Sequence, residues 1–109
     1  MANTFKLKSK NNIGVSTVGI YTVPSATTTV IIGVTCTNVS GQGINVGIGI
    51  SRATNGDDIN ILKNVPIPQG SALEIMQGNK IVGEAADTVT AKSDVNSTLD
   101  VALTIMEIT

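Results

Sequence analysis

The chain has 109 residues, a length that suits a single domain spanning residues 1–109. Hydrophobic residues make up 41% of it but aromatic residues only 2%, so any core must be aliphatic. Seven Lys and Arg residues against eight Asp and Glu give a formal net charge of −1, which argues against a nucleic-acid-binding protein, since such a protein needs a basic stripe.

The first ten residues alternate in character. Phe5 and Leu7 are apolar, whereas Lys6, Lys8 and Lys10 fall on the opposite side of an extended segment. We expect residues 1–10 to form either a short strand in the chain's own sheet or an N-terminal docking arm. Such an arm would add to the open sheet edge of a neighbour, with Phe5 and Leu7 fixing the register. The lysine row is typical of a solvated edge strand that resists aggregation, which we favour over phosphate binding.

The segment Ile13–Val23 predicts a second strand that follows a turn at Asn11-Asn12. Its apolar alternation changes phase near Ser16-Thr17, and this change predicts a β-bulge. A proline then ends the strand, and residues 24–26 predict a turn into the centre of the chain.

The central stretch contains two β-rich runs, Thr28–Asn38 and Ile44–Ile50, joined by a glycine-containing turn at residues 39–43. We expect these runs to pair as an antiparallel hairpin with one buried face. A two-residue period places on that face the side chains of Val30, Ile32, Val34, Cys36, Ile44, Val46, Ile48 and Ile50.

The rest of the chain predicts further short strands separated by turns. Asn55-Gly56 predicts a type I′ hairpin turn, because both residues tolerate positive φ. The prolines within residues 66–70 predict a crossing loop, since proline removes ladder donors. Later strands are expected at Ser71–Met76, Lys80–Val82 (after a turn at 78–79), Asp87–Lys92 and a final run whose inner face holds Leu99, Val101, Leu103 and Ile105. Glu107 is expected to break that final alternation, so that Met106 or Ile108 makes contacts outside the core.

Apolar residues nowhere recur at helical spacing over a useful window, and no linker divides the chain. Short strands at near-regular spacing indicate an all-β protein. We therefore predict a two-sheet antiparallel β-sandwich, either jelly-roll or immunoglobulin-like, of about 8 strands.

The sequence shows no catalytic constellation. The chain has no His, which removes the usual general base, the Ser-His and Cys-His pairs and most zinc sites. Cys36 is expected to be a buried thiol rather than a nucleophile. The cluster Asn55–Asp58 lacks the spacing of a calcium loop, and Glu84 and Asp87 are expected to lie on a loop surface. We therefore expect no catalytic residue, no cofactor and no metal.

The surface is expected to contact other proteins. Only 14% of the residues are charged, against about 25% in typical soluble domains. A low charge suits a subunit covered by neighbours, such as a homo-oligomer, and a monomer solubilised by hydroxyls and amides is the alternative. The sequence shows neither a signal peptide nor a run long enough to span a bilayer, so we expect no membrane association.

Gly47 and Gly49 fall on the outer face of the run Ile44–Ile50. Glycine within a strand usually marks a bulge or the close approach of another backbone. A smooth face of this kind would let a neighbouring chain lie flat against it, and a strongly twisted strand with nothing above it is the alternative. The candidate protein-interface residues are therefore Phe5, Leu7, Asn45, Gly47, Gly49 and Ser51.

Several motifs together resemble a known class of proteins. They are Y-T-V-P at residues 21–24, T-T-T-V-I-I-G-V at 27–34, P-I-P-x-G-S at 66–71, G-N-K-I-V at 78–82, A-D-T-V at 86–89 and V-x-L-T-I-M-E-I at 101–108. The chain resembles small virion structural proteins of tailed double-stranded DNA bacteriophages, especially those of marine cyanobacterial hosts. The motifs consist of turns and strand faces, so the resemblance supplies no functional residue.

This resemblance implies a non-enzymatic virion component assembled in the bacterial host cytoplasm. Its partners would be the major capsid protein or other virion proteins. The favoured role is a capsid decoration or cement protein on the outer shell, and a tail, neck or fibre-adaptor component is the alternative. A carbohydrate- or surface-binding β-sandwich ranks third, because sugar binding usually needs more aromatic residues than this chain has.

Overall fold

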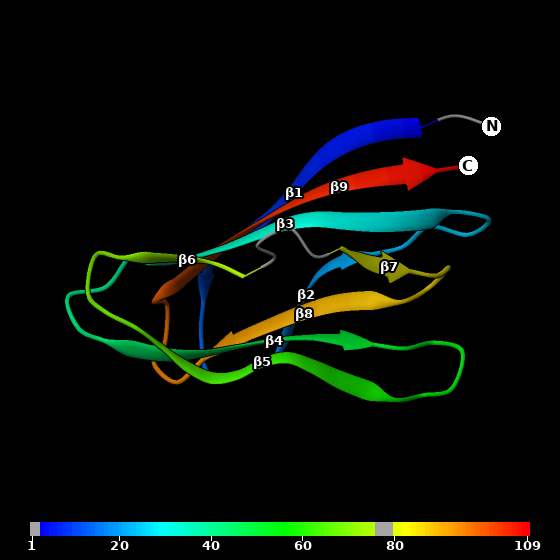
Figure 1. The fold of residues 1–109 in the computed structure, drawn as a ribbon. Coiled ribbons are helices and arrows are strands. Elements are labelled where there is room, and N and C mark those ends of the chain that lie inside the picture. The colour runs from blue at the N-terminus through cyan, green and yellow to red at the C-terminus, as the bar shows by residue number, and fades with distance from the viewer. Residues whose placement is uncertain (1–2, 76–79) are drawn as a thin grey trace.

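A computed structural model of the protein describes residues 3–75 and 80–109. These residues form nine strands in two antiparallel sheets that face each other (Figure 1). The strands are β1 (Asn3–Ile13), β2 (Val18–Thr22), β3 (Thr28–Asn38), β4 (Ile44–Ser51), β5 (Asp58–Ile67), β6 (Ala72–Glu74), β7 (Ile81–Gly83), β8 (Thr88–Ser93) and β9 (Leu99–Ile108). The predicted all-β, two-sheet sandwich is confirmed. This part of the chain contains no helix capable of crossing a membrane.

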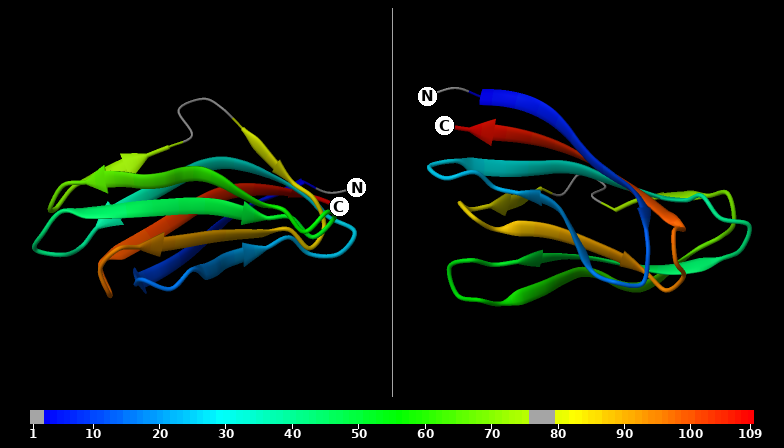
Figure 2. Two further views of the ribbon diagram at one scale, coloured as in Figure 1. Left: turned by 90° about the horizontal axis from the view of Figure 1, so that it is seen from below. Right: turned by 180° about the vertical axis from the view of Figure 1, so that it is seen from behind.

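The strand order identifies the jelly-roll form of the sandwich. Sheet A has the order β1-β9-β3-β6, with β7 also paired to β3, and sheet B has the order β2-β8-β4-β5. The chain folds back at the β4–β5 hairpin, so that β1 pairs with β9, β2 with β8, and β3 with both β6 and β7. Because β6 and β7 pair with successive stretches of β3, they act as halves of one broken strand, and an eight-strand jelly roll results. Figure 2 shows the two sheets from below and from behind.

An aliphatic core fills the space between the sheets. The inner faces predicted for β4 and β9 are confirmed, since all eight of these side chains are buried: Ile44, Val46, Ile48, Ile50, Leu99, Val101, Leu103 and Ile105. Burial of each such side chain stabilises the fold by about 1.5–3 kcal/mol. Of the two aromatic residues, Tyr21 is buried and Phe5 is exposed.

The predicted central hairpin is wrong. β3 and β4 belong to different sheets, and the loop at residues 39–43 crosses between them. The side chain of Asn38 organises this crossing: its Oδ1 accepts hydrogen bonds from the amide and the hydroxyl of Ser40 at 2.9 and 2.7 Å. Its Nδ2 donates at 2.7, 3.0 and 3.2 Å to the backbone carbonyls of Gln42, Ile67 and Pro68. Since Asn38 is only 1% exposed, these bonds satisfy polar groups that water does not reach.

β3 changes face at a β-bulge. Its register against β9 shifts immediately after Ile31, which makes Ile32 the extra residue. The buried face therefore holds Ile31 before the bulge and Val34 and Cys36 after it. Val30 and Ile32, which the alternation placed inside, are half-buried instead. A strict two-residue period fails here because an unpaired residue reverses the faces that follow it.

The chain crosses between the sheets within the single strand predicted for Ile13–Val23. Asn11-Asn12 lies inside β1, where Asn12 has a φ of 53° and the register shifts, so the predicted turn is a bulge. The chain then leaves sheet A, and β2 begins in sheet B. The phase change near Ser16-Thr17 marks this crossing, and the bulge of the second strand lies at Ile20.

The β4–β5 hairpin forms at Asn55-Gly56 as predicted. Gly56 has a φ of 75°, but Asn55 is not among the residues with positive φ, so the turn is not of type I′. The Asn55 side chain instead accepts a hydrogen bond from the amide of Asp57 at 3.1 Å. The amide of Gly56 donates to the carbonyl of Arg52 at 3.0 Å, which makes a longer turn.

The crossing loop predicted for residues 66–70 begins only after Ile67. Pro66 lies inside β5, which is an edge strand of sheet B where a missing donor is tolerated. β6 covers part of the strand predicted at Ser71–Met76, while β7 and β8 lie close to their predicted positions. Met76 and the turn predicted at 78–79 lie outside the described residues.

Candidate functional site: two outer surfaces

Cys36 is fully buried in β3. Burial, and to a smaller extent the negative charge of Glu74, raises the pKa of its thiol to about 12. The thiol is therefore protonated at neutral pH and is a poor nucleophile, as the sequence predicted. Within residues 3–75 and 80–109, no three Cys, Asp or Glu side chains come together to hold a metal ion.

Asp87 belongs to a buried ion-pair cluster, and the prediction that it lies on a loop surface is wrong. It is 1% exposed and accepts hydrogen bonds from the amides of Ala53 and Glu84, each at 3.0 Å. Arg52 Nε lies 2.9 Å from Asp87 Oδ2 as an ion pair without hydrogen-bond geometry, and Arg52 also pairs with Glu84. Burial alone would raise the pKa of Asp87, but the two amides and Arg52 outweigh burial and lower it. The cluster ties the β4–β5 loop to the β7–β8 loop, which is a structural role.

β1 forms one edge of sheet A and pairs with β9 from Asn3 to Ile13. The structure therefore shows the pairing within the chain's own sheet that the sequence left open, and docking onto a neighbour stays a prediction. Phe5 and Leu7 project from the outer face and are 69% and 68% exposed. Lys6, Lys8 and Lys10 share the inner side of β1, because each pairs with an inward-facing residue of β9.

A row of apolar side chains crosses the outer face of sheet A. The registers align Val82 of β7 with Val30 of β3, Val30 with Met106 of β9, and Met106 with Phe5 of β1. Directly paired residues project from the same face, so these four side chains form one row across four strands. Leu7 of β1 and Ile108 of β9 flank this row on the same face. The row and these two residues are called the apolar stripe here; its members are Val82, Val30, Met106, Phe5, Leu7 and Ile108.

Glu107 lies on the inner face directly behind the apolar stripe. The prediction that it breaks the alternation of β9 is wrong, since it is only 6% exposed and the two-residue period continues through it. Lys6 Nζ lies 2.7 Å from Oε1, and the Tyr21 hydroxyl donates to Oε2 at 2.5 Å. The hydrogen bonds from Lys6 and Tyr21 lower the pKa of Glu107 despite its burial. The charged carboxylate thus binds side chains of β1 and β2 and pins the edge strand.

Tyr21 completes this cluster from sheet B. Its hydroxyl also shares a hydrogen bond with Thr29 Oγ1 at 2.8 Å, and Lys8 Nζ lies 5.8 Å from the centre of its ring. Burial and the hydrogen bond to Glu107 raise the pKa of Tyr21 to about 12, so the phenol stays protonated at neutral pH. The lysines of β1 therefore reach across the core edge: Lys6 pairs with Glu107 of sheet A, and Lys8 lies over the ring of Tyr21 of sheet B.

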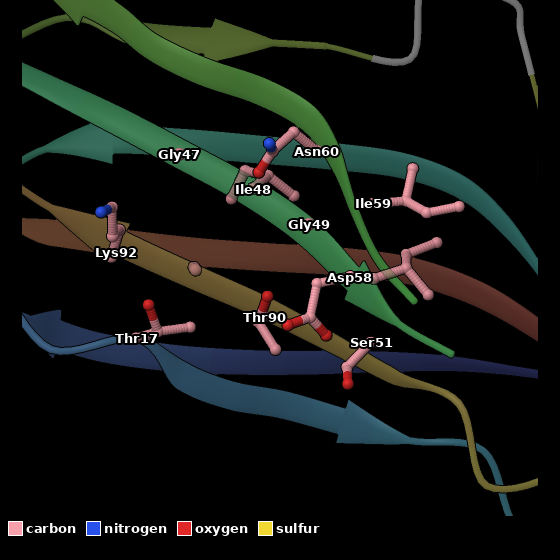
Figure 3. Close-up of a pocket in the computed structure, with 12 residues that line it drawn as sticks. Thr17, Gly47, Ile48, Gly49, Ser51, Asp58, Ile59, Asn60, Thr90 and Lys92 are labelled. Carbon is pink, nitrogen blue, oxygen red and sulfur yellow. The ribbon is translucent and has the colours of Figure 1, made fainter. Parts of the chain in front are cut away.

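Gly47 and Gly49 lie on the outer face of β4, at the floor of a groove of about 330 Å³ (Figure 3). Asn60 of β5 lines one wall, and Thr90 and Lys92 of β8 line the other. A Cβ atom on Gly49 would stand 2.8 Å from the backbone oxygen of Ile59, whereas one on Gly47 would meet nothing closer than 3.5 Å. The close backbone that the sequence led us to expect therefore belongs to β5 of the same chain.

Asn45 and Ser51 lie toward the two ends of β4. The Asn45 amide donates to Asp94 Oδ1 at 2.9 Å and its side-chain Nδ2 donates to Asp94 Oδ2 at 3.2 Å, which ties β4 to the β8–β9 turn. Ser51 lines the groove. Both side chains therefore lie beside the glycines as the alternation predicted, although that of Asn45 is engaged within the chain.

The six predicted interface residues fall on opposite faces of the sandwich. Phe5 and Leu7 belong to sheet A, whereas the four residues of β4 belong to sheet B, so one flat partner would not cover both sets. Sequence reasoning missed Val30 and Val82 because their place beside Phe5 depends on the register of four strands. The only available signal was the outward position of Met106 on β9.

No family model matches this sequence, and no curated protein sequence matches it either. Solved structures with the same fold do match. A chain from the disulfide-linked pili of Bacillus endospore appendages has a TM-score of 0.59 at 12% identity, covering 99% of this chain and 87% of the other. A chain from the acid-stable capsid of Helicobacter pylori bacteriophage KHP30 has a TM-score of 0.59 at 10% identity, covering 100% and 94%.

A third structure with this fold comes from the T13 viral particle of IBDV. The TM-score is 0.60 at 9% identity, covering 96% of this chain but only 30% of the IBDV chain. At such identities the comparisons show a shared fold and nothing more. Two of the three folds come from virus particles, in agreement with a virion-type fold, while the tailed-phage and cyanophage parts of the resemblance stay predictions.

Proposed function

We propose that this protein is a non-enzymatic virion component, a capsid decoration or cement protein that binds the outer surface of the major capsid shell. The observation that carries the proposal is the apolar stripe. Phe5 and Leu7 are more than two-thirds exposed and Val82 is 56% exposed, although the core already buries its own aliphatic residues. Contiguous exposed apolar patches on small proteins usually mark interaction sites. The fold shared with capsid and pilus proteins supports an assembly role.

The outer face of sheet A is suited to a broad, shallow contact. Its central row carries no charge, so docking would desolvate no ion there. A stable interface buries roughly 800 Å² on each partner, so docking would involve the rim of this face as well as its central row. Many copies, each bridging adjacent capsid subunits, would add their modest contacts by multivalency and oppose the outward pressure of packaged DNA.

The test is cosedimentation of the purified protein with shells stripped of accessory proteins. The double variant Phe5→Ser with Met106→Ser should bind at least about 30-fold more weakly, because it removes the centre of the stripe. The matched control is Val15→Ser, which replaces an exposed valine outside both sheets and should bind like the wild type. Full binding by the double variant would overturn the stripe as the contact surface.

A tail, neck or fibre-adaptor component is the second candidate, favoured by the fold shared with a pilus chain. A disulfide-linked fibre of these 109 residues is not supported, because the one cysteine is buried and each subunit would need two accessible ones. Binding assays on isolated capsids and isolated tails distinguish the two placements. Saturable binding to tails alone would favour this candidate over the decoration role.

Carbohydrate binding is the third candidate, and the groove over Gly47 and Gly49 is the place to test it. Hydroxyl and amide groups of Thr17, Asn60 and Thr90 line the groove. No aromatic side chain is among its lining residues, and sugars usually stack on one. A glycan-array screen with no specific signal would remove this candidate.

A further inference from the structure

We propose that the open edge of β1 accepts an extended segment of another protein in which apolar residues alternate with acidic ones. β1 is the last strand of sheet A, and in the described residues no other strand pairs along its outer edge. β1 follows a regular register from Asn3 to Lys10, and over this length every second residue directs its amide and carbonyl away from β9, toward the open edge. Such an edge is a template for strand addition, in which main-chain hydrogen bonds supply affinity.

The two faces of β1 specify the chemistry of that segment. Lys6, Lys8 and Lys10 share the inner side, whereas Phe5 and Leu7 share the outer face. An added strand continues the pleat, so each of its residues projects on the same side as the β1 residue that it opposes. Residues opposite the lysines are therefore favoured when acidic, and residues opposite Phe5 and Leu7 are favoured when apolar.

Charge argues against a second copy of this chain as the occupant. If β1 paired antiparallel with β1 of another copy, the two lysine rows would lie on the same side, where like charges destabilise the pairing. Pairing with another edge of the same chain also provides too few acids for a row of three lysines. β2 has no charged residue, and β6 and β7 are three residues each, with Glu74 as their single acid. β5 supplies only Asp58, at its first position, together with Lys63 and an interrupting Pro66. The segment that fits therefore comes from a different protein.

The lysines alone would be explained as protection against aggregation, which is a common use of charge on edge strands. The outer face of β1 does not fit that explanation. A strand built only to repel neighbours would carry polar side chains there, yet it displays Phe5 and Leu7 and continues the apolar stripe of β9 and β3. An added strand would extend this stripe by one strand and would cover both exposed side chains.

The inference deepens the proposed function, because it names the chemistry that the partner presents, and a peptide-binding experiment tests it. Nine-residue peptides with blocked ends, in which Val alternates with Glu, with Lys or with Ser, are titrated into the intact protein and followed by amide NMR. The Glu peptide should bind at least about tenfold more tightly than the Lys peptide, and its advantage should shrink as salt is added. Shifts should concentrate on the amides of β1.

Charge exchange and backbone blocking sharpen the test. In the variant with Lys8→Glu and Lys10→Glu, which leaves the Lys6 ion pair intact, preference should reverse toward the Lys peptide by a similar factor. Two further Glu peptides carry N-methyl groups on alternate amides, which removes the hydrogen-bond donors along one edge of the extended peptide. The blocked edge is opposite in the two peptides. Their affinities should differ, because only one of them retains free amides on the edge that faces β1. If the variant does not fold, the three peptides and the methylated pair still decide the matter on the wild-type protein.

Absence of peptide binding, equal binding of the Glu and Lys peptides, or equal binding of the two methylated peptides would each overturn strand addition. These outcomes are distinct from failure of the proposed function. Shell binding that depends on Phe5 and Met106 without any peptide binding would retain the decoration role and discard the edge site. Peptide binding without shell binding would retain the edge site and discard the decoration role.

Discussion

At the scale of single residues, Asn38 is the side chain on which the crossing between the sheets depends. It makes five hydrogen bonds that join the 39–43 loop to the end of β5. Asn38→Ala would leave buried carbonyls unpaired, and we expect it to lower the free energy of unfolding by about 3 kcal/mol, measured by urea denaturation. The control Asn60→Ala removes an exposed amide of β5 and should cost less than about 0.5 kcal/mol. Equal losses would contradict this role for Asn38.

Glu107 gives the fold a sensitivity to acid. Its pKa in the folded protein lies below the ordinary value of 4.5, so its charged form stabilises the fold above that value, and this contribution is lost as the pH falls through the folded pKa. Asp87, whose pKa is also lowered, adds to the loss in the acid range. We expect the free energy of unfolding, measured by urea denaturation over a pH series, to decline below about pH 4.5.

The variant Glu107→Gln isolates the share of that decline that belongs to Glu107. At neutral pH it loses the ion pair with Lys6 and should be less stable than the wild type. Because its side chain does not titrate, its stability should fall less steeply with acid, and the two curves should approach each other. Parallel curves would show that Glu107 does not contribute to the acid sensitivity.

At the scale of elements, the irregular pairing of β5 with β4, whose register shifts twice, explains why two nearby glycines differ. A Cβ on Gly49 would press on the backbone oxygen of Ile59 at 2.8 Å, and backbone cannot rotate away as a side chain can. We expect Gly49→Ala to cost about 2 kcal/mol in thermal or urea unfolding. Gly47→Ala, whose nearest contact would be 3.5 Å, should be neutral or stabilising by about 0.5 kcal/mol, because alanine reduces the entropy of the unfolded chain.

Equal effects of these two substitutions would contradict the proximity of β5 to Gly49. Measuring both stability and binding for these variants also distinguishes a structural role of the glycines from a role in partner binding. If Gly47→Ala leaves stability unchanged but weakens a binding activity, then the groove of sheet B contacts a partner. If neither changes, Gly47 is not part of a contact surface.

At the scale of the whole molecule, the start of β1 and the end of β9 lie side by side at one end of the sandwich (Figure 1). The apolar stripe lies close to this end, because Phe5 pairs with Met106. Asn3 pairs with Ile108, while the loop at residues 68–71 lies at the far end, where the carbonyl of Ser71 accepts a hydrogen bond from the amide of Asn38. We expect a fluorescent protein fused after Thr109 to reduce shell binding in a cosedimentation assay. The same protein inserted between Gln69 and Gly70 should leave binding intact. The opposite order would place the contact surface at the far end.

The sequence was sufficient for the fold class and for the inner faces of regular strands. Alternation without helical spacing predicted the two-layer sandwich, and the inward residues of β4 and β9 follow the two-residue period without a fault. The prediction of strand faces from the sequence failed where a residue has no partner on the neighbouring strand. Ile32 in β3 and Asn12 in β1 both sit at bulges, and a bulge leaves no mark on the composition of a strand.

The candidate surfaces could be predicted only in part from the sequence, because they too depend on how strands pair. Phe5 and Leu7 stood out because they alternate with lysines along a single segment. Met106, Val30 and Val82 lie beside them only because β1 pairs with β9, β9 with β3, and β3 with β7. These strands are far apart in the chain, so the sequence did not predict the full stripe. Glu107 was misplaced because a charge in an apolar run looks like an outward residue until its partners, Lys6 and Tyr21, are known.

By itself the sequence determined that this protein is an aliphatic, all-β sandwich without histidine, because the side-chain period and the residue types are local properties. Only the tertiary structure decided that β3 and β4 face each other rather than pair, that the sandwich is a jelly roll, and that one apolar row crosses four strands. These features are set by long-range register and by single polar side chains such as Asn38, whose hydrogen bonds join segments that no local pattern connects.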